Sequence, residues 1–229
     1  MTTKITEENQ SRNKADLLIG IYVFCIVVAE LMGAKTFPIA RIGNFNFNGA
    51  MGMFLLPFIF SINDIFTEVY GYERTKNLAR MSVIVVLFLI IFSAIAISLP
   101  PSKRFLTMNE SYKQIFSQSI RISIASLMAM GVANFMDIKV FIKIKRRMGK
   151  SKLWLRNNLS NIMALFLDTV VFMGLAFYSP KIPVVENINF LWGIILPYWI
   201  LKVSVSMMGT PLVYGGIKWL KNSKPPFRQ

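Results

Sequence analysis

Two carboxylates lie inside an apolar segment, and they are the residues of this sequence that most directly suggest chemistry. The segment 50–70 is long enough to cross a bilayer, yet it contains Asp64 and Glu68. An ionised carboxylate near the centre of the hydrocarbon costs roughly 2.5–3.5 kcal/mol on insertion scales, so such residues usually face a polar cavity. Asp64 and Glu68 are one helical turn apart and would lie on the same face of a helix. We therefore expect a polar site beside this face.

Other apolar segments also carry charged residues close to the middle of the bilayer. When the direction of each span is set by its flanking basic residues, Glu30, Asp168 and Lys202 fall within about two helical turns of the midplane. Asn161 would share a helical face with Asp168, because about two turns separate them. These acceptors and donors could bind a polar ligand. The competing interpretation is that Lys202 pairs with an aspartate and only stabilises helix packing.

The elements that must position these residues are membrane-spanning helices. The chain has 229 residues, of which 54% are hydrophobic, and this fraction exceeds the value for ordinary soluble domains. We predict an all-α integral membrane protein in which one domain, 17–220, contains six transmembrane helices, between polar tails at 1–16 and 221–229. The six apolar segments are 17–37, 50–70, 82–100, 118–138, 159–178 and 191–217.

The distribution of basic residues predicts the orientation of these helices. With both termini in the cytoplasm, the cytoplasmic segments hold 18 Lys and Arg residues and the external ones hold 5. This asymmetry is the positive-inside signature of a multi-pass membrane protein. The formal net charge of +15 therefore indicates topology and contact with lipid headgroups, and we expect no nucleic-acid partner.

Several residue types needed for catalysis are absent from the sequence. There is no histidine, only Cys25 could supply a thiol, and no phosphate-binding loop motif occurs. A Ser-His-Asp triad and a histidine-ligated metal site are therefore excluded. We expect no enzyme activity, no metal and no cofactor.

An internal repeat suggests that the chain consists of two related halves. The segments 28–37 and 132–141 share five identical residues in ten, and the same shift aligns Asp64 with Asp168. Since each half would contain three spans, the second half would be inverted relative to the first. Inverted repeats of this kind form the midplane sites of many transporters.

Longer motifs resemble those of a known family. The segment 57–80, which contains the residues Asn-Asp-Ile-Phe-Thr-Glu-Val-Tyr-Gly and ends in Ala-Arg, is similar to the signature of the queuosine precursor transporters, also called the vitamin uptake transporter family. The segments 137–141, 154–160, 168–172 and 210–214 resemble the later helices of that family. The resemblance implies import of a 7-deazaguanine, such as queuine or its 7-aminomethyl or 7-cyano precursors, across the cell inner membrane for tRNA modification. It also implies a homodimer.

Two positions depart from the family pattern. Asn63 replaces a threonine that commonly precedes the aspartate, and Glu30 replaces an amide expected in the first helix. An additional carboxylate could change which precursor is accepted, or it could be a neutral residue that faces another helix.

These observations together give a hypothesis for the site. Asp64 and Asp168 would accept hydrogen bonds from a nucleobase-like ligand, Lys202 and Asn161 would donate to it, and Asn63 and Glu30 would complete the site. The residues expected at a cytoplasmic gate are Glu68, Tyr70, Arg80 and Asp137.

Two other classes of function compete with this hypothesis. The alternative is the substrate-capturing subunit of an energy-coupling-factor transporter, which would need an ATPase partner for transport. A membrane-embedded enzyme is disfavoured, because no nucleophile with a base occurs at a recognisable spacing.

Overall fold

The computed structural model describes the backbone of residues 2–43, 45–148, 153–208 and 210–221, and side chains within 13–43, 45–133, 161–206 and 213–220. Helices form most of it. In chain order the elements are α1 (Thr2–Met32), β1 (Thr36–Ile42), β2 (Phe45–Ala50), the 3-10 helix η1 (Met51–Leu55), α2 (Leu56–Tyr70), α3 (Tyr72–Ser98), α4 (Asn109–Met148), α5 (Leu153–Phe177), α6 (Val184–Met208) and α7 (Thr210–Lys221).

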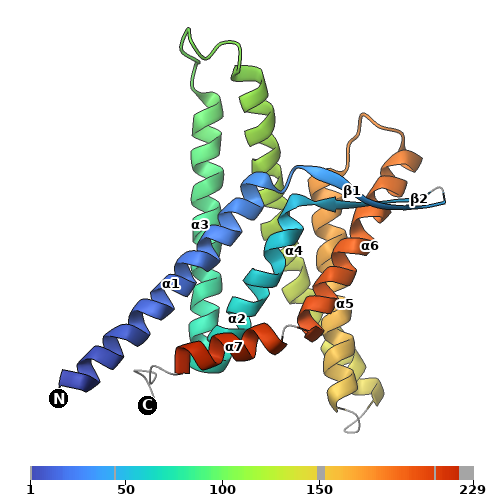
Figure 1. Cartoon of the computed structure of the whole chain (residues 1–229). Helices are drawn as coiled ribbons and strands as arrows, with labels where there is room; N and C mark the ends of the chain where they lie inside the picture. The colour runs from blue at the N-terminus through green and yellow to red at the C-terminus, as the bar shows by residue number, and fades with distance from the viewer. Residues whose placement is uncertain (1, 44, 149–152, 209, 222–229) are drawn as a thin grey trace.

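The helices α1 to α6 follow one another up and down through the molecule (Figure 1). Within the described residues, five segments are long and apolar enough to cross a membrane, and the described part of α5, Asn161–Phe177, is a shorter apolar helix. The prediction of a multi-pass helical membrane protein is therefore confirmed. Each of the six predicted apolar segments overlaps one of these helices.

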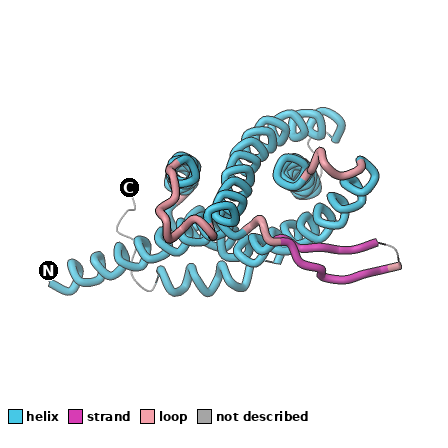
Figure 2. Tube along the Cα trace, turned by 90° about the horizontal axis from the view of Figure 1, so that it is seen from above, coloured by secondary structure: helices cyan, strands magenta, loops and turns pink. Residues whose placement is uncertain are grey.

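A β-hairpin follows α1, where the sequence predicted a loop in an all-α protein. Strands β1 and β2 are antiparallel and pair Thr36 with Ala50 at one end and Ile42 with Phe45 at the other. The alternation Phe-Asn-Phe-Asn in β2 has the period of a strand, and Gly43 adopts a φ of 60° at the turn. These strands were not predicted from the sequence because the segment was placed outside the membrane, between two spans. Figure 2 shows the hairpin projecting from the helices.

The end of the chain also differs from the prediction. Instead of one span over 191–217, α6 begins earlier, ends at Met208, and is followed by the separate helix α7. Pro211 explains the break, because a proline has no backbone N–H to donate and is tolerated only in the first turn of a helix. Pro197 lies inside α6 without ending it.

The start of α1 and the end of α7 meet at the same end of the molecule. Lys14 Nζ donates a hydrogen bond of 3.0 Å to the carbonyl oxygen of Trp219 and lies 5.0 Å from the centroid of its indole ring. Both ends of the described chain are therefore on one side of the helices (Figure 1).

Side chains of α4 hold the ends of two other helices. Ser119 donates to the Leu31 carbonyl near the end of α1 at 2.9 Å, and Gln118 donates to the Ala176 carbonyl in α5 at 3.1 Å. The Arg121 guanidinium donates to the Leu175 carbonyl at 2.8 Å. These bonds satisfy carbonyl groups that have no partner within their own helices.

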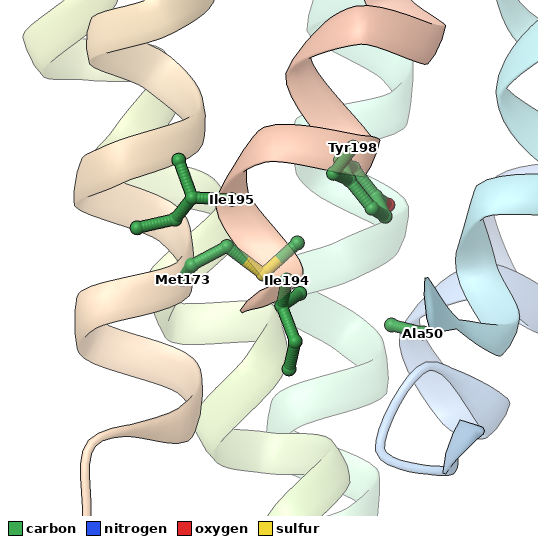
Figure 3. Close-up of a cluster of buried hydrophobic side chains, with 5 residues drawn as sticks. All are labelled: Ala50, Met173, Ile194, Ile195 and Tyr198. Atoms are coloured by element: carbon green, nitrogen blue, oxygen red, sulfur yellow. The ribbon is translucent and has the colours of Figure 1, made fainter. Parts of the chain in front are cut away.

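Apolar side chains then fix the helices around the centre of the molecule. Figure 3 shows one cluster, in which Met173 of α5 packs with residues of α6 and with Ala50 at the end of β2. A second cluster joins α1, α2 and α3 through Tyr22, Ile62, Phe66 and Leu78. Members of both clusters, Tyr22 of the second and Ala50 and Tyr198 of the first, also line the candidate site.

Candidate ligand-binding cavity

A cavity of about 250 Å³ lies at the centre of the helices. Each helix from α1 to α6 contributes to its wall, as do the end of β2 and η1. Its volume falls just below the range of about 300–1,000 Å³ that is typical of pockets for drug-sized ligands. The wall is mainly apolar with a few polar groups, which is the usual composition of a small-molecule site.

One ion pair lies in the wall of this cavity. Lys202 of α6 and Asp168 of α5 are joined by a bond of 2.5 Å between Nζ and Oδ2, and their side chains are 7% and 24% exposed. The Lys202 ammonium also lies 5.3 Å from the centroid of the Tyr198 ring, a distance typical of a cation–π interaction. The two charges compensate each other, so neither is buried alone.

A third charged residue in the wall has no such partner. Glu30 of α1 is 7% exposed, and its Oε2 atom has no hydrogen-bond partner among the described residues. The side chains of Ser123 and Ser126 on α4 lie beside it. A buried carboxylate oxygen without a partner is costly unless it can accept a hydrogen bond from a ligand or water.

The Tyr198 side chain links the two charged parts of the cavity. It is 6% exposed, and it lies within electrostatic range of both the Glu30 and the Asp168 carboxylates. Its ring also packs against Phe172, with 6.3 Å between the ring centroids. Together with Phe60, these rings give the cavity aromatic surfaces against which a flat molecule could stack.

Residues 50–216 match the family model described as "Putative vitamin uptake transporter". The chain belongs to the vitamin uptake transporter family. It is accordingly a transporter and not an enzyme, as predicted.

The chain is also similar to a curated bacterial protein. The chain is 26% identical over 197 residues to the "Probable queuosine precursor transporter" of Haemophilus influenzae, and the match covers 80% of this chain and 78% of that one. No solved structure matches the chain. Asp168 and Lys202 lie within the residues matched by the family model, whereas Glu30 precedes them.

Three of the six predicted ligand residues line the cavity, and three do not. Glu30, Asp168 and Lys202 are in its wall, although they come from helices far apart in the sequence. Asp64 is exposed on α2, and the exposed Asn161 donates a hydrogen bond of 3.0 Å to Ser206 Oγ. The role predicted for these two residues as ligand contacts stays a prediction, with no support from their position.

Asn63 lies near the cavity without lining it. Its side chain is half-buried beside the Tyr22 side chain, and its Oδ1 atom has no hydrogen-bond partner among the described residues. Tyr22 itself is 4% exposed and lines the cavity. Asn63 is therefore a neighbour of the site and not a wall residue.

Three of the four residues predicted at a gate, Glu68, Tyr70 and Arg80, lie in α2 or the first part of α3. The centroid of the Tyr70 ring lies 5.1 Å from the centroid of the Phe66 ring and 5.6 Å from the Cζ atom of Arg74. Glu68 and Arg80 are both exposed, and Arg80 donates to the Asn77 side chain at 3.4 Å. The side chain of Asp137 is outside the described residues. The gate therefore stays a prediction.

Sequence reasoning missed several polar residues of the cavity wall, among them Tyr22, Ser82 and Ser126. A signal for Tyr22 was present in the sequence. Tyr22 and Glu30 are two turns apart on α1, and the small residues Ala29 and Gly33 continue the same face, so this face could have been assigned from Glu30 alone. Among the residues that the structure describes, no cluster of potential metal ligands occurs.

Proposed function

We propose that this protein imports queuosine precursors, which are 7-deazaguanines, across the cell inner membrane for use in tRNA modification. Its family supports a transport function, and the printed name of the Haemophilus influenzae relative supports the substrate class. The chain itself adds a central cavity of about 250 Å³ that a small flat heterocycle could occupy.

The observation that carries the proposal is that the Lys202–Asp168 pair places a hydrogen-bond donor beside a hydrogen-bond acceptor in the cavity wall. A guanine-like edge presents a carbonyl oxygen beside two N–H donors. The Lys202 ammonium has three donors, of which one bonds to Asp168 at 2.5 Å, and another can bond to the ligand's carbonyl. The Asp168 carboxylate can accept the adjacent N–H groups as charge-assisted hydrogen bonds.

Transport requires the cavity to open to each side of the membrane in turn. We propose that α1–α3 and α4–α6 act as two inverted halves that move relative to one another around the ligand. Glu30 belongs to the first half, and the Lys202–Asp168 pair belongs to the second, so a ligand bound to all three would contact both.

The positive-inside rule then sets the orientation of the chain. We propose that the side on which α1 begins and α7 ends faces the cytoplasm, because the segments expected there carry 18 basic residues against 5 on the other side. The turn between α2 and α3 lies on this side, so the proposed gate of Glu68, Tyr70, Arg80 and Asp137 is cytoplasmic. A homodimer is a further expectation, and it comes from the family resemblance.

The decisive experiment measures queuosine in the tRNA of a bacterium that can neither synthesise nor import the precursors. Each precursor is supplied at low concentration to cells that express the protein or its double variant Asp168→Asn/Lys202→Gln, which removes both charges of the pair together. We expect the wild type to restore the modification and the double variant to fail at equal expression. Glu110→Gln, a change at an exposed residue in the first turn of α4, is the matched control and should behave as wild type.

Two results would contradict the proposal. If no precursor restores queuosine in cells with the wild type, the ligand assignment is wrong. If the purified chain binds a precursor but does not carry it into proteoliposomes unless an ATPase partner is added, the protein is instead the capture subunit of an energy-coupling-factor transporter.

A further inference from the structure

We propose that Glu30 determines ligand specificity, such that the cavity prefers a 7-deazaguanine with an ammonium group to an uncharged analogue with the same ring. This inference rests on the function proposed above and names the substrate class more closely. The additional contact would be a charge-assisted hydrogen bond between the ligand's ammonium group and the Glu30 carboxylate.

The charges in the cavity wall do not cancel one another. Among the described residues that line the cavity, only Glu30, Asp168 and Lys202 carry a formal charge. Lys202 and Asp168 neutralise each other through their contact at 2.5 Å. The wall therefore has one carboxylate in excess when Glu30 is ionised.

The Glu30 carboxylate lies in a buried position. Glu30 is 7% exposed, and its Oε2 atom has no hydrogen-bond partner among the described residues. The hydroxyls of Ser123 and Ser126 can donate hydrogen bonds to this carboxylate, but they are uncharged and cannot compensate a full negative charge. An unpaired charge in a buried position is strongly unfavourable, so a cation delivered by the ligand would be bound tightly.

The edge of the ring and its substituent would be bound by different residues. The Lys202–Asp168 pair offers a donor and an acceptor for the edge of the ring, as proposed above. Glu30 lies on α1, in the other half of the chain, and the Tyr198 side chain is within electrostatic range of both carboxylates. We expect the unsatisfied Oε2 atom of Glu30 to bind a substituent of the ring while the pair holds its edge.

The experiment measures equilibrium binding of two ligands that differ only in the group at C7 of the ring. One carries an aminomethyl group, which is a cation at neutral pH, and the other carries a neutral cyano group. Both are titrated by isothermal calorimetry into the full chain in lipid nanodiscs at pH 7. We expect the wild type to bind the aminomethyl compound at least tenfold more tightly, because a charge-assisted hydrogen bond in a buried site contributes at least that much.

Three variants make the result specific to Glu30. Glu30→Gln keeps the size of the side chain and should reduce affinity for the aminomethyl compound about tenfold, with little change for the cyano compound. Glu30→Asp keeps the charge and should restore part of the preference, which a purely structural role would not. The exposed Glu110→Gln should keep the wild-type preference, and thermal unfolding of each variant checks that it is folded.

The outcomes distinguish this inference from the function on which it rests. If the wild type binds both compounds equally, or if Glu30→Gln retains the preference, the inference is wrong although the import function stands; equal binding is the result expected if Glu30 holds a proton. If Glu30→Gln weakens both compounds to the same extent, Glu30 contacts the shared ring instead. If the wild type binds neither compound, the inference fails together with the proposed function.

Discussion

Two pairs of carboxylates lie within apolar helices of this protein, and the structure gives them opposite surroundings. Asp64 and Glu68 are both exposed on α2. Glu30 and Asp168 are buried or half-buried in the wall of the central cavity. The composition of the surrounding segments does not explain this difference, because all four carboxylates lie in predominantly apolar sequence.

The difference comes from the face that each helix presents to its neighbours. On α2 the buried side chains include Ile62, Ile65 and Phe66, which fill the spaces next to α1, α3 and α7 and leave Asp64 on another face. On α1 the face shared by Tyr22 and Glu30 points into the cavity. An intramembrane charge thus indicates a functional region, whereas helix packing determines which charge can contact a ligand.

The largest expected effect follows from breaking the Lys202–Asp168 pair. Lys202→Ala leaves the Asp168 carboxylate without its partner in the cavity wall and should lower the free energy of unfolding by about 3–5 kcal/mol. Thermal unfolding in detergent would show this as a lower midpoint. Removal of both charges in Lys202→Ala/Asp168→Ala should cost less than Lys202→Ala alone. If the double variant is the less stable of the two, the pair is not the compensated unit described here.

The next effect tests the packing of the β-hairpin against α6. A Cβ atom at Gly193 would meet the carbonyl oxygen of Asn46 in β2, so Gly193→Ala should displace the hairpin from α6 and cost about 1–3 kcal/mol of stability. Gly174→Ala in α5 is the matched control, because a Cβ atom there meets nothing within 4 Å. That substitution should be neutral or stabilise by up to about 1 kcal/mol. Equal losses in the two variants, measured by thermal unfolding, would contradict this account of the hairpin.

A smaller effect of opposite sign is expected at Glu30. In the absence of ligand, Glu30→Gln removes a buried carboxylate that has no compensating cation and should stabilise the protein by about 1 kcal/mol. Thermal unfolding of the ligand-free wild type and variant would measure this directly. A lower unfolding midpoint in the variant would mean that the Glu30 carboxylate already has stabilising partners. Glu30 would then not differ from Asp168, whose charge is compensated by Lys202.

The smallest effect is expected at Asp64. Because this side chain does not line the cavity, Asp64→Asn removes no group that contacts the ligand in the site proposed above. Ligand affinity, measured by the same calorimetric titration, should stay within about twofold of wild type, a difference of less than 0.5 kcal/mol. A tenfold loss of affinity would show that Asp64 reaches the ligand in another conformation and would remove the contrast between the two pairs of carboxylates.

Much of the fold was predictable because its signals are local. Runs of about 20 apolar residues identify spans regardless of how those spans pack, since the hydrocarbon must be crossed by a helix with satisfied backbone groups. The hairpin at 36–50 also had a local signal, in the alternation of β2 and in Gly43, but the same residues are compatible with an interfacial loop. The last span was predicted over 191–217 because apolar composition continues through Gly209 and Pro211, although these are residues that could break the helix, and α6 ends just before them.

The sequence by itself determined the multi-pass helical architecture, the asymmetry of basic residues, the absence of histidine chemistry, and the presence of charged residues in the apolar segments. It also contained the motifs that place the chain in its family. Which of the charges meet was decided only by the tertiary structure. Lys202 and Asp168 come together because α5 and α6 pack side by side, and Glu30 joins them because α1 turns one face toward the same cavity while α2 turns Asp64 away. Charge and hydrophobicity are properties of single residues. Which faces of two helices pack together depends on the fit of side chains that are far apart in the chain.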